Sequence, residues 1–305
     1  MKEKIGEVIL NYEYDKNSEL NINDEGVREI EETLLEIVRT EEDLEKRLQN
    51  ENNEMFLYQL SSIRQNILRW FDFNPDASLL EVGAECGAIT ALFCENVEQV
   101  VAVEVSKRRA MINATRNKSY KNLEVFVGNF NNIRFKQKFD YITMIGVLEY
   151  SAYYSDSHEP FLDMLKKAKD LLKPGGKLFV AIENKYGLKY WAGAAEEHTG
   201  RFFDGIEGYR SADVVRTFSK SSLKALLQQA GFKDSVFYYP VPDYKMPMEI
   251  YSEKHLPKSG SIANISPAYD RPRYEFFDER LAFSTICEDG LFEEFANSFL
   301  VLVEN

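Results

Sequence analysis

The sequence predicts an α/β fold in which a mostly parallel sheet carries helices on both faces. Short apolar, β-branched runs alternate with helical patterns, and the turn LLKPGGK ends one helix sharply before the next strand. Strands that alternate with helices pair in parallel through right-handed crossovers. The expected strands are 79–83, 99–104, 123–127, 140–146 and 177–182. The expected helices are 87–95, 106–116, 160–172 and 220–230.

Two helical stretches precede this alternation. Residues 24–50 are acidic and repeat apolar side chains at helical spacing, which is typical of a helix or helix pair packed on a core. The stretch MFLYQLSSIRQNILRWF at 55–71 then leads into the first strong strand. We therefore expect an N-terminal helical extension over residues 1–74, followed by the main domain at 75–305.

The net charge and the few cysteines and histidines argue against several classes of binding partner. The net charge of -13 opposes attraction to phosphate backbones or anionic lipid, so nucleic acid is not an expected partner. Three cysteines form neither a disulfide framework nor a zinc spacing, and no run of about 18 apolar residues occurs. The three histidines are scattered, so no metal site is expected. We expect a reduced, cytoplasmic protein that acts on a small molecule, and the sequence leaves its oligomeric state open.

The turn EVGAECG at 81–87 follows the first predicted strand and raises the question of what it binds. In open α/β sheets, ligands lie beyond the carboxyl ends of the strands. Glu104 ends the second predicted strand, 23 residues after Glu81. That is near the spacing at which an acidic side chain accepts hydrogen bonds from ribose hydroxyls. The turn therefore predicts a site for a cofactor that contains a nucleoside.

Glu85 separates two cofactors that share this layout. A dinucleotide favours G-x-G-x-x-G, and here its second glycine is replaced by Glu85, whose charge would repel pyrophosphate. S-adenosylmethionine carries a sulfonium and an ammonium group instead, so carboxylates around the turn cost less. Glu85 thus favours S-adenosylmethionine, unless its side chain simply points to solvent.

Five motifs in this order resemble the class I S-adenosylmethionine-dependent methyltransferases over about 55–240. They are E-V-G-x-x-x-G at 81–87, Glu104, G-N-F at 128–130, FDYITMIGVLEY at 139–150 and LLKPGG at 171–176. More narrowly, YQLSSIRQNILRW and IENKYGLKYWAGAAEEHTGRFFDG resemble bacterial methyltransferases often found alongside glycosyltransferases of surface polysaccharide assembly.

That resemblance implies a Rossmann-like fold with a seven-stranded, mostly parallel sheet. Its final strand is normally antiparallel, and FANSFLVLVEN at 295–305 supplies it after a sixth strand, DSVFYYPV. Residues 242–294 then form a C-terminal insertion. Both this insertion and the long stretch at 184–218 are expected on the substrate side.

The resemblance also implies the cofactor residues. Glu81, Gly83 and Gly87 shape the methionine side, Glu104 holds the ribose, and Asn129 with Phe130 meets the adenine. Asn129 stands where an aspartate is common, and its amide oxygen still accepts a hydrogen bond. Tyr58 and Arg64 either close over the cofactor or line a helix face. The expected cofactor-binding residues are Tyr58, Arg64, Glu81, Gly83, Glu85, Gly87, Glu104, Asn129, Phe130 and Gly146.

The acceptor side is predicted from residue types. Aromatic and polar residues interleave after the fifth strand, which suits a ring-shaped polar acceptor such as a sugar, or a loop packed on the core. A hydroxyl acceptor has to lose a proton, and His198 in EEHTGRFFDG is the expected base. The acidic pair Glu196 and Glu197 reads as a solvated face. The expected acceptor-binding residues are Glu183, Asn184, Tyr186, Trp191, Arg201 and Asp204.

Three functions remain open from the sequence. The first is an S-adenosylmethionine-dependent methyltransferase acting on a saccharide or nucleotide-sugar hydroxyl. The second is a nicotinamide-dependent oxidoreductase or epimerase on a similar sheet. The third is a noncatalytic partner protein that keeps the fold with a degenerate cofactor site.

Overall fold

A computed structural model describes residues 1–15, 25–40, 43–48, 54–210, 215–263, 265 and 273–305. The chain divides into two compact units. Unit 1 comprises Met1–Thr143 with Leu171–Gly176, and unit 2 comprises Met144–Asp170 with Lys177–Asn305. Parts of the predicted helical pattern at 24–50 and of both substrate-side segments lie outside the described residues.

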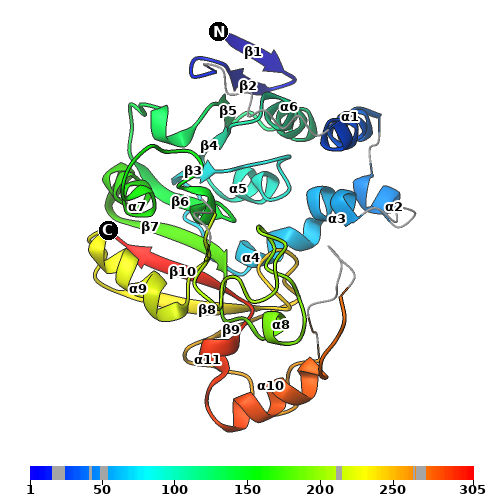
Figure 1. The fold of residues 1–305 in the computed structure, drawn as a ribbon. Coiled ribbons are helices and arrows are strands. Elements are labelled where there is room, and N and C mark those ends of the chain that lie inside the picture. Colours follow the sequence, from blue (N-terminus) through cyan, green and yellow to red (C-terminus); the bar gives the residue numbers. More distant parts are fainter. Residues whose placement is uncertain (16–24, 41–42, 49–53, 211–214, 264, 266–272) are drawn as a thin grey trace. The chain divides into compact units, whose positions relative to one another are not determined.

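Unit 1 contains the first strands and the N-terminal helices (Figure 1). Its strands are β1 (Lys2–Ile5), β2 (Val8–Asn11), β3 (Ser78–Val82), β4 (Gln99–Glu104), β5 (Leu123–Val127) and most of β6 (Phe139–Ile145). Its helices are α1 (Glu25–Thr40), α2 (Leu44–Leu48), α3 (Glu54–Leu60), α4 (Asn66–Arg69), α5 (Thr90–Asn96) and α6 (Lys107–Arg116). Two 3₁₀ helices, η1 (Ser62–Gln65) and η2 (Phe130–Asn132), complete it.

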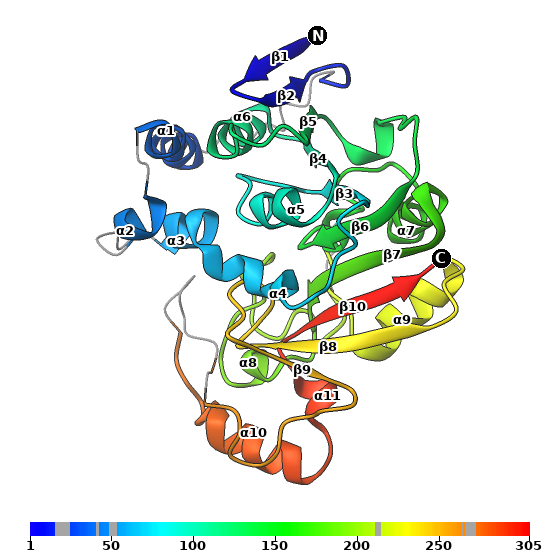
Figure 2. The ribbon, with the colours of Figure 1, turned by 180° about the vertical axis from the view of Figure 1, so that it is seen from behind.

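Unit 2 contains the later strands, and β10 lies between β7 and β8 in antiparallel pairing (Figure 2). Its strands are β7 (Leu172–Glu183, from residue 177 on), β8 (Ser235–Val241), β9 (Glu249–Ser252) and β10 (Ser298–Glu304). Its helices are α7 (Pro160–Leu171, up to residue 170), α8 (Leu188–Trp191), α9 (Lys220–Gln229), α10 (Glu279–Glu288), α11 (Phe292–Phe295) and the 3₁₀ helix η3 (Leu148–Tyr150).

Among the described residues the sheet has ten strands in the order β1-β2-β5-β4-β3-β6-β7-β10-β8-β9, so the prediction of seven strands was wrong. It is mixed: β2 with β5, β5 with β4, and β4 with β3 pair in parallel, whereas β1 with β2 and β8 with β9 pair antiparallel. The three strands that the sequence analysis missed are β1, β2 and β9. Each has four residues, which is too short for an alternating pattern to stand out.

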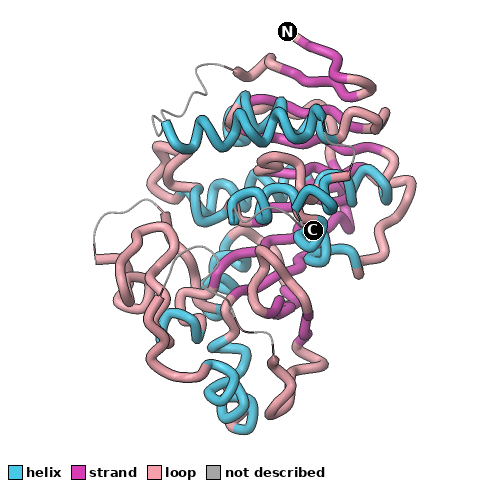
Figure 3. The backbone as a smooth tube through the Cα atoms, turned by 90° about the vertical axis from the view of Figure 1, so that its right-hand side faces the viewer, coloured by secondary structure: helices cyan, strands magenta, loops and turns pink. Residues whose placement is uncertain are grey.

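The N-terminal extension is therefore not wholly helical. The first strands form a hairpin, in magenta beside the N-terminus in Figure 3, and Gly6 turns it at a φ of +61°. Helix α1 confirms the amphipathic pattern in the described part of 24–50. Its Leu34, Ile37 and Val38 pack with Ile112 of α6, and the two helices lie side by side in Figure 1.

The predicted helix at 55–71 is broken into α3, η1 and α4. Ser61 ends the first piece, because its hydroxyl oxygen accepts a hydrogen bond from the Ile63 backbone N–H and so caps η1. Serine side chains compete in this way with the helical hydrogen bonds of the backbone. The break brings Arg64, which is buried, into η1.

The turn between β3 and α5 is closely packed at Gly87. Gly87 has a φ of +78°, and a Cβ there would lie 2.6 Å from Asn113 Oδ1 and 2.7 Å from Asn117 Nδ2. Both asparagines are buried and bonded to each other, so they have little room to move. Helix α5 accordingly begins at Thr90, three residues after the predicted start.

Gly87→Ala should therefore destabilise the protein more than Gly290→Ala. Gly290 has a similar φ of +71°, but a Cβ there would meet no atom of the described residues within 4 Å, so it reports the backbone cost alone. We expect about 1 kcal/mol for that backbone cost in both variants, and about 1–3 kcal/mol more at Gly87 from overpacking. Urea denaturation measures both free energies of unfolding. Equal losses would contradict the close packing of this turn.

Candidate active site

In unit 1, the turn after β3 is fixed to the end of β4. Gly83 N–H donates to Val103 O over 2.9 Å. Glu85 N–H donates to Glu104 Oε2 over 2.9 Å, and Ser106 N–H donates to Glu104 Oε1 over 2.8 Å. Each oxygen of the Glu104 carboxylate thus accepts one backbone hydrogen bond and keeps a further lone pair. The structure brings together the turn and the acidic residue that the sequence analysis paired.

Glu85 is held by a buried arginine. Arg64 Nη1 donates to Glu85 Oε2 over 3.0 Å, and Arg64 Nη2 donates to the Tyr58 hydroxyl oxygen over 2.9 Å. The Arg64 guanidinium carbon also lies 3.9 Å from the centroid of the Tyr58 ring. Of the alternatives for Glu85, a side chain directed only to solvent does not fit, because its charge is paired with Arg64.

The backbone conformation at position 85 favours glycine. Glu85 has a φ of +45°, which is in the left-handed region. A side chain there costs about 1–2 kcal/mol relative to the ordinary helical conformation.

Glu85→Gly should be more stable than Glu85→Ala by about 1 kcal/mol. Both substitutions delete the carboxylate that pairs with Arg64, so their difference isolates the backbone strain. Thermal and urea unfolding of the two variants measure it. An alanine variant as stable as the glycine variant would show that position 85 is not strained.

The carboxyl groups of Glu81, Glu85 and Glu104 surround this turn. Glu81 is 5% exposed, and its Oε2 accepts from Thr90 Oγ1 over 2.6 Å. Burial raises the pKa of Glu81 to about 8, so this carboxyl is mostly protonated at neutral pH. Burial also raises the pKa of Glu104. Further negative charge, such as a pyrophosphate, would be disfavoured here, whereas a cationic group would favour ionisation of these carboxyls.

The predicted adenine contacts lie at the end of β5. Asn129 Oδ1 accepts from Asn131 N–H over 2.9 Å and caps η2, and Phe130 is buried with its ring 6.1 Å from that of Phe135. Sequence reasoning missed Tyr14, whose carbonyl oxygen would lie 2.9 Å from a Cβ at Gly128. No local pattern connects two segments so far apart in the chain.

In unit 2, the segment after β6 reaches the predicted base. The hydroxyl of Tyr150 lies 3.2 Å from His198 Nδ1, and the two rings meet edge to face with centroids 5.1 Å apart. Gly146 has a φ of +69°, and a Cβ there would lie 2.8 Å from the Tyr244 hydroxyl. The predicted base His198 thus contacts Tyr150, and the predicted Gly146 lies against Tyr244.

Glu149 was missed by the sequence analysis. Its side chain is 1% exposed and burial raises its pKa to about 8, with the nearby Glu183 acting in the same direction. Oε1 accepts from the Tyr244 hydroxyl over 3.5 Å, and Oε2 has no hydrogen-bond partner within the described part of the chain. Glu149 is therefore a largely neutral carboxylic acid at pH 7.

The backbone around His198 is anchored by Glu196. Glu196 is 2% exposed, and its Oε2 accepts from His198 N–H over 2.8 Å and from Thr199 N–H over 2.7 Å. Its Oε1 accepts from the Tyr209 hydroxyl over 3.3 Å. The interpretation of Glu196 and Glu197 as a solvated face was therefore wrong.

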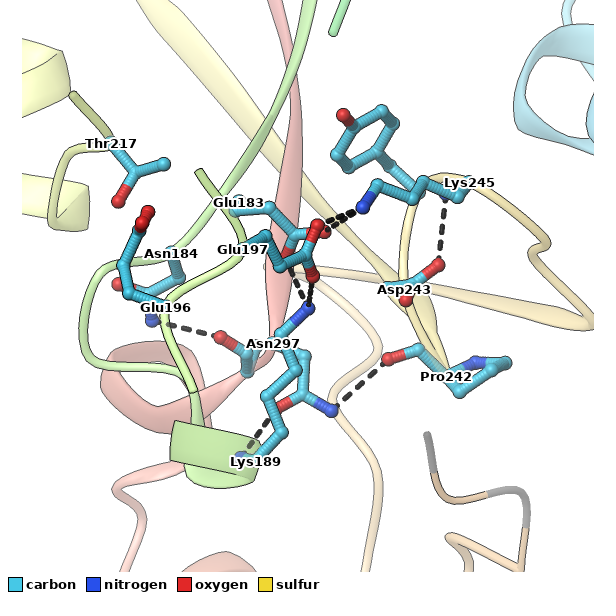
Figure 4. A network of polar contacts seen from close by, with 12 residues as sticks. Glu183, Asn184, Lys189, Glu196, Glu197, Thr217, Pro242, Asp243, Lys245 and Asn297 are labelled. Carbon is cyan, nitrogen blue, oxygen red and sulfur yellow. Dashed lines mark hydrogen bonds and ion pairs between the residues drawn. The ribbon is translucent and has the colours of Figure 1, made fainter. Parts of the chain in front are cut away.

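Glu183 and Glu197 bind the same two lysines (Figure 4). Glu183, fully buried at the end of β7, lies 2.8 Å from Lys189 Nζ and 3.7 Å from Lys245 Nζ. Glu197 Oε1 lies 2.5 Å from Lys189 Nζ, and its Oε2 accepts from Lys245 Nζ. Of these four residues, the sequence analysis had selected only Glu183.

The remaining predicted acceptor residues have mixed environments. Asn184 is fully buried: its Nδ2 donates to two backbone carbonyl oxygens just before β10, both over 2.8 Å, and its Oδ1 accepts from Tyr186 N–H over 3.0 Å. Two of these three hydrogen bonds tie Asn184 to the chain before β10, and the third lies inside its own loop. Trp191 is 41% exposed and donates to Tyr186 O over 3.3 Å, Arg201 is exposed, and Asp204 is buried. Their roles toward an acceptor stay predictions.

The described residues contain neither a group of metal-binding side chains nor a membrane-spanning helix. Across the described ranges, no three His, Cys, Asp or Glu side chains are grouped so that they could hold a metal ion. In the same residues, no helix combines the length and the apolar character that crossing a membrane requires.

A family model described as a methyltransferase domain matches residues 53–235, which is more than half of the chain. The chain belongs to this methyltransferase family. The methyltransferase is similar in fold to phosphoethanolamine N-methyltransferase 1 of Haemonchus contortus, solved with phosphoethanolamine and S-adenosylhomocysteine. The TM-score is 0.50 at 13% identity, over 91% of this chain and 48% of that one. That likeness supports a Rossmann-like fold with a mixed sheet and helices on both faces.

Other solved structures give lower scores. The N-methyltransferase NodS from Bradyrhizobium japonicum, in complex with S-adenosylhomocysteine, matches with a TM-score of 0.48 at 13% identity, over 89% of this chain and 96% of that one. A Thermotoga maritima S-adenosylmethionine-dependent methyltransferase, described as a possible histamine N-methyltransferase, matches with a TM-score of 0.46 at 19% identity, over 82% and 90%. No curated protein sequence matches this methyltransferase.

Proposed function

We propose that this methyltransferase uses S-adenosylmethionine to methylate a hydroxyl of a small polar acceptor, most simply a saccharide or nucleotide sugar. The observation that carries the proposal is the turn at 83–87, which is fixed to Glu104 while Arg64 neutralises Glu85. A degenerate cofactor site would not be expected to keep a buried arginine paired with the one residue that departs from the glycine pattern.

The residues present fit S-adenosylmethionine. Glu104 keeps a lone pair on each carboxylate oxygen, which suits two ribose hydroxyls. The carboxyls of Glu81 and Glu104, whose pKa values are raised by burial, suit the cationic methionine end, because a nearby cation favours their ionisation and a phosphate opposes it. Asn129 and Phe130 are the proposed adenine contacts. Tyr58 accepts a hydrogen bond from Arg64, which pairs with Glu85 of the turn.

When bound, S-adenosylmethionine supplies an electrophilic methyl group on a sulfonium. The chain then has to orient the acceptor and remove the hydroxyl proton. We assign the second task to His198. If its Nδ1–H donates to the Tyr150 hydroxyl oxygen, the lone pair is on Nε2, which is the tautomer that a base requires. Glu196 fixes the backbone of this histidine.

Exposed aromatic side chains support a saccharide acceptor. Trp191 is 41% exposed, Phe202 58% and Phe203 36%, all within the segment between β7 and α9. Flat apolar faces beside polar groups suit sugar rings, which present C–H faces between their hydroxyls. Arg201 and Asp204 in the same segment are the proposed polar partners.

The test is transfer of label from methyl-labelled S-adenosylmethionine to a panel of sugars, nucleotide sugars and small amines. We expect label on hydroxyl-bearing sugars and none on the amines. A protein that binds the cofactor but labels neither the panel nor a small-molecule extract would instead be the noncatalytic partner.

A further inference from the structure

Lys189 and Lys245 converge on one carboxylate in unit 2 (Figure 4). Glu197 bridges their two ammonium groups with its two oxygens, and Glu183 contacts both lysines as well. The side chains of Glu183 and Lys189 are 0% and 3% exposed, whereas those of Glu197 and Lys245 are 13% and 17% exposed. Solvent therefore reaches the network on the Glu197 side.

The charges of these four groups cancel. Without the Glu197 carboxylate, Lys189, Lys245 and Glu183 carry one net positive charge. Burying an ion carries a desolvation penalty, and apolar side chains of similar volume often stabilise a fold as well as buried ion pairs do. Stability alone therefore does not account for two lysines held in this position. A singly charged oxyanion would restore neutrality.

Tyr190 supplies a second, independent observation. Its side chain is 3% exposed, Lys189 Nζ lies 5.2 Å from its ring centroid, and its hydroxyl has no hydrogen-bond partner among the described residues. A buried hydroxyl without a partner loses the hydrogen bonds that it makes to water in the unfolded chain, so it destabilises the fold. Like the two ammonium groups, the hydroxyl is a hydrogen-bond donor, and its ring lies beside Lys189 at the buried end of the network.

Glu197 belongs to the same loop as the proposed base. The neighbouring Glu196 holds the backbone of His198 and Thr199 through its own hydrogen bonds. The loop therefore keeps this anchor when the Glu197 side chain is displaced. An anion that replaces Glu197 would therefore bind beside the loop that carries His198.

We infer that Lys189, Lys245 and Tyr190 form a subsite for a singly charged oxyanion of the methyl acceptor, a carboxylate or a phosphodiester, and that Glu197 fills this subsite until the acceptor displaces it. The inference rests on the proposed function and narrows its substrate class. The acceptor is then an acidic sugar or a phosphodiester-linked sugar, not a neutral one.

Glu149 makes this subsite depend on pH. The titratable groups that act on Glu149 are Glu183 on β7, and Tyr244 and Lys245 on the segment after β8. Burial raises the pKa of Glu149 to about 8, so below that pH the neutral carboxyl does not repel an anion. Above it, the ionised carboxylate does. Anion affinity should therefore fall as the pH rises through about 8, and Glu149→Gln should remove this dependence.

The experiment is calorimetric titration of the full chain with D-glucuronate, with dimethyl phosphate as the phosphodiester arm and D-glucose as the uncharged probe. Glu197→Gln should bind the matching anion at least tenfold more tightly than the wild type, and Lys245→Met at least tenfold more weakly. Neither substitution should alter the response to D-glucose. The matched control is Glu293→Gln, because Glu293 and Glu253 form ion pairs with Lys220 alone among the described residues.

Several results would overturn the subsite. They are unchanged affinity in Glu197→Gln, an equal gain in Glu293→Gln, or no binding of either anion. Should Glu197→Gln fail to fold, Lys245→Met decides: wild-type affinity for both anions in this variant would overturn the inference, whereas equal affinities of the wild type at pH 7 and pH 9 would overturn only the role of Glu149. A parallel titration with S-adenosylmethionine separates the two proposals. Cofactor binding without anion binding refutes only the subsite, and anion binding without cofactor binding refutes only the proposed function.

Discussion

Glu104→Ala should weaken S-adenosylmethionine binding at least tenfold. Tenfold corresponds to about 1.4 kcal/mol, and a hydrogen bond to a charged group contributes about 1.5–3 kcal/mol. The substitution also removes the acceptor for the backbone N–H groups of Glu85 and Ser106, so the turn loses its attachment to β4. Both effects lower the affinity, and calorimetric titration measures their sum.

Two further variants separate these effects. Glu104→Gln keeps one oxygen that can accept from the turn, so it should fall between alanine and the wild type. Glu124→Gln removes a carboxyl from β5 that pairs with Lys2 instead, and it should bind the cofactor like the wild type. Wild-type affinity in Glu104→Ala would mean that the ribose is held elsewhere.

His198→Gln should lower kcat by about 100-fold or more, the range that a positioned general base contributes. Glutamine keeps the polarity and approximate size of the side chain but cannot accept a proton near neutral pH. Cofactor affinity should be unchanged, because the proposed cofactor residues named in unit 1 do not include His198. Single-turnover methyl transfer to the best acceptor measures the chemical step.

The chain offers matched controls for this histidine. His158 and His255 are exposed, so His158→Gln and His255→Gln should keep wild-type rates. Tyr150→Phe removes the hydroxyl that lies 3.2 Å from Nδ1 and should shift the pH profile of kcat. Wild-type kcat in His198→Gln would assign the proton transfer to another group.

The sequence predicts buried strands well because such strands are continuous apolar runs. Strands β4 and β5 have the predicted bounds, and β3 and β6 begin and end one residue before theirs. The hairpin β1–β2 was missed because four-residue strands carry little periodic signal. The break at Ser61 depends on a hydrogen bond that a helical pattern does not reveal.

The two halves of the site differ in how far the sequence predicts them. The turn at 81–87 and Glu104 were paired by their positions after adjacent strands, which topology brings together. The network of Glu183, Lys189, Glu197 and Lys245 joins a strand end, a helix and two loops. From sequence alone, a charged residue is expected to be exposed to solvent. The conformation of the loops determines which residue it pairs with. The pairing of Glu85 with Arg64 could not be predicted from the sequence for the same reason.

The most direct test is calorimetric titration of the wild-type protein, stripped of bound ligand, with S-adenosylmethionine and with NADH. The three carboxyls around the turn, with Arg64 paired to Glu85, predict micromolar binding of S-adenosylmethionine and no measurable binding of NADH. Tight NADH binding, or no binding of S-adenosylmethionine, would contradict the account of this turn as a site for a cationic nucleoside cofactor.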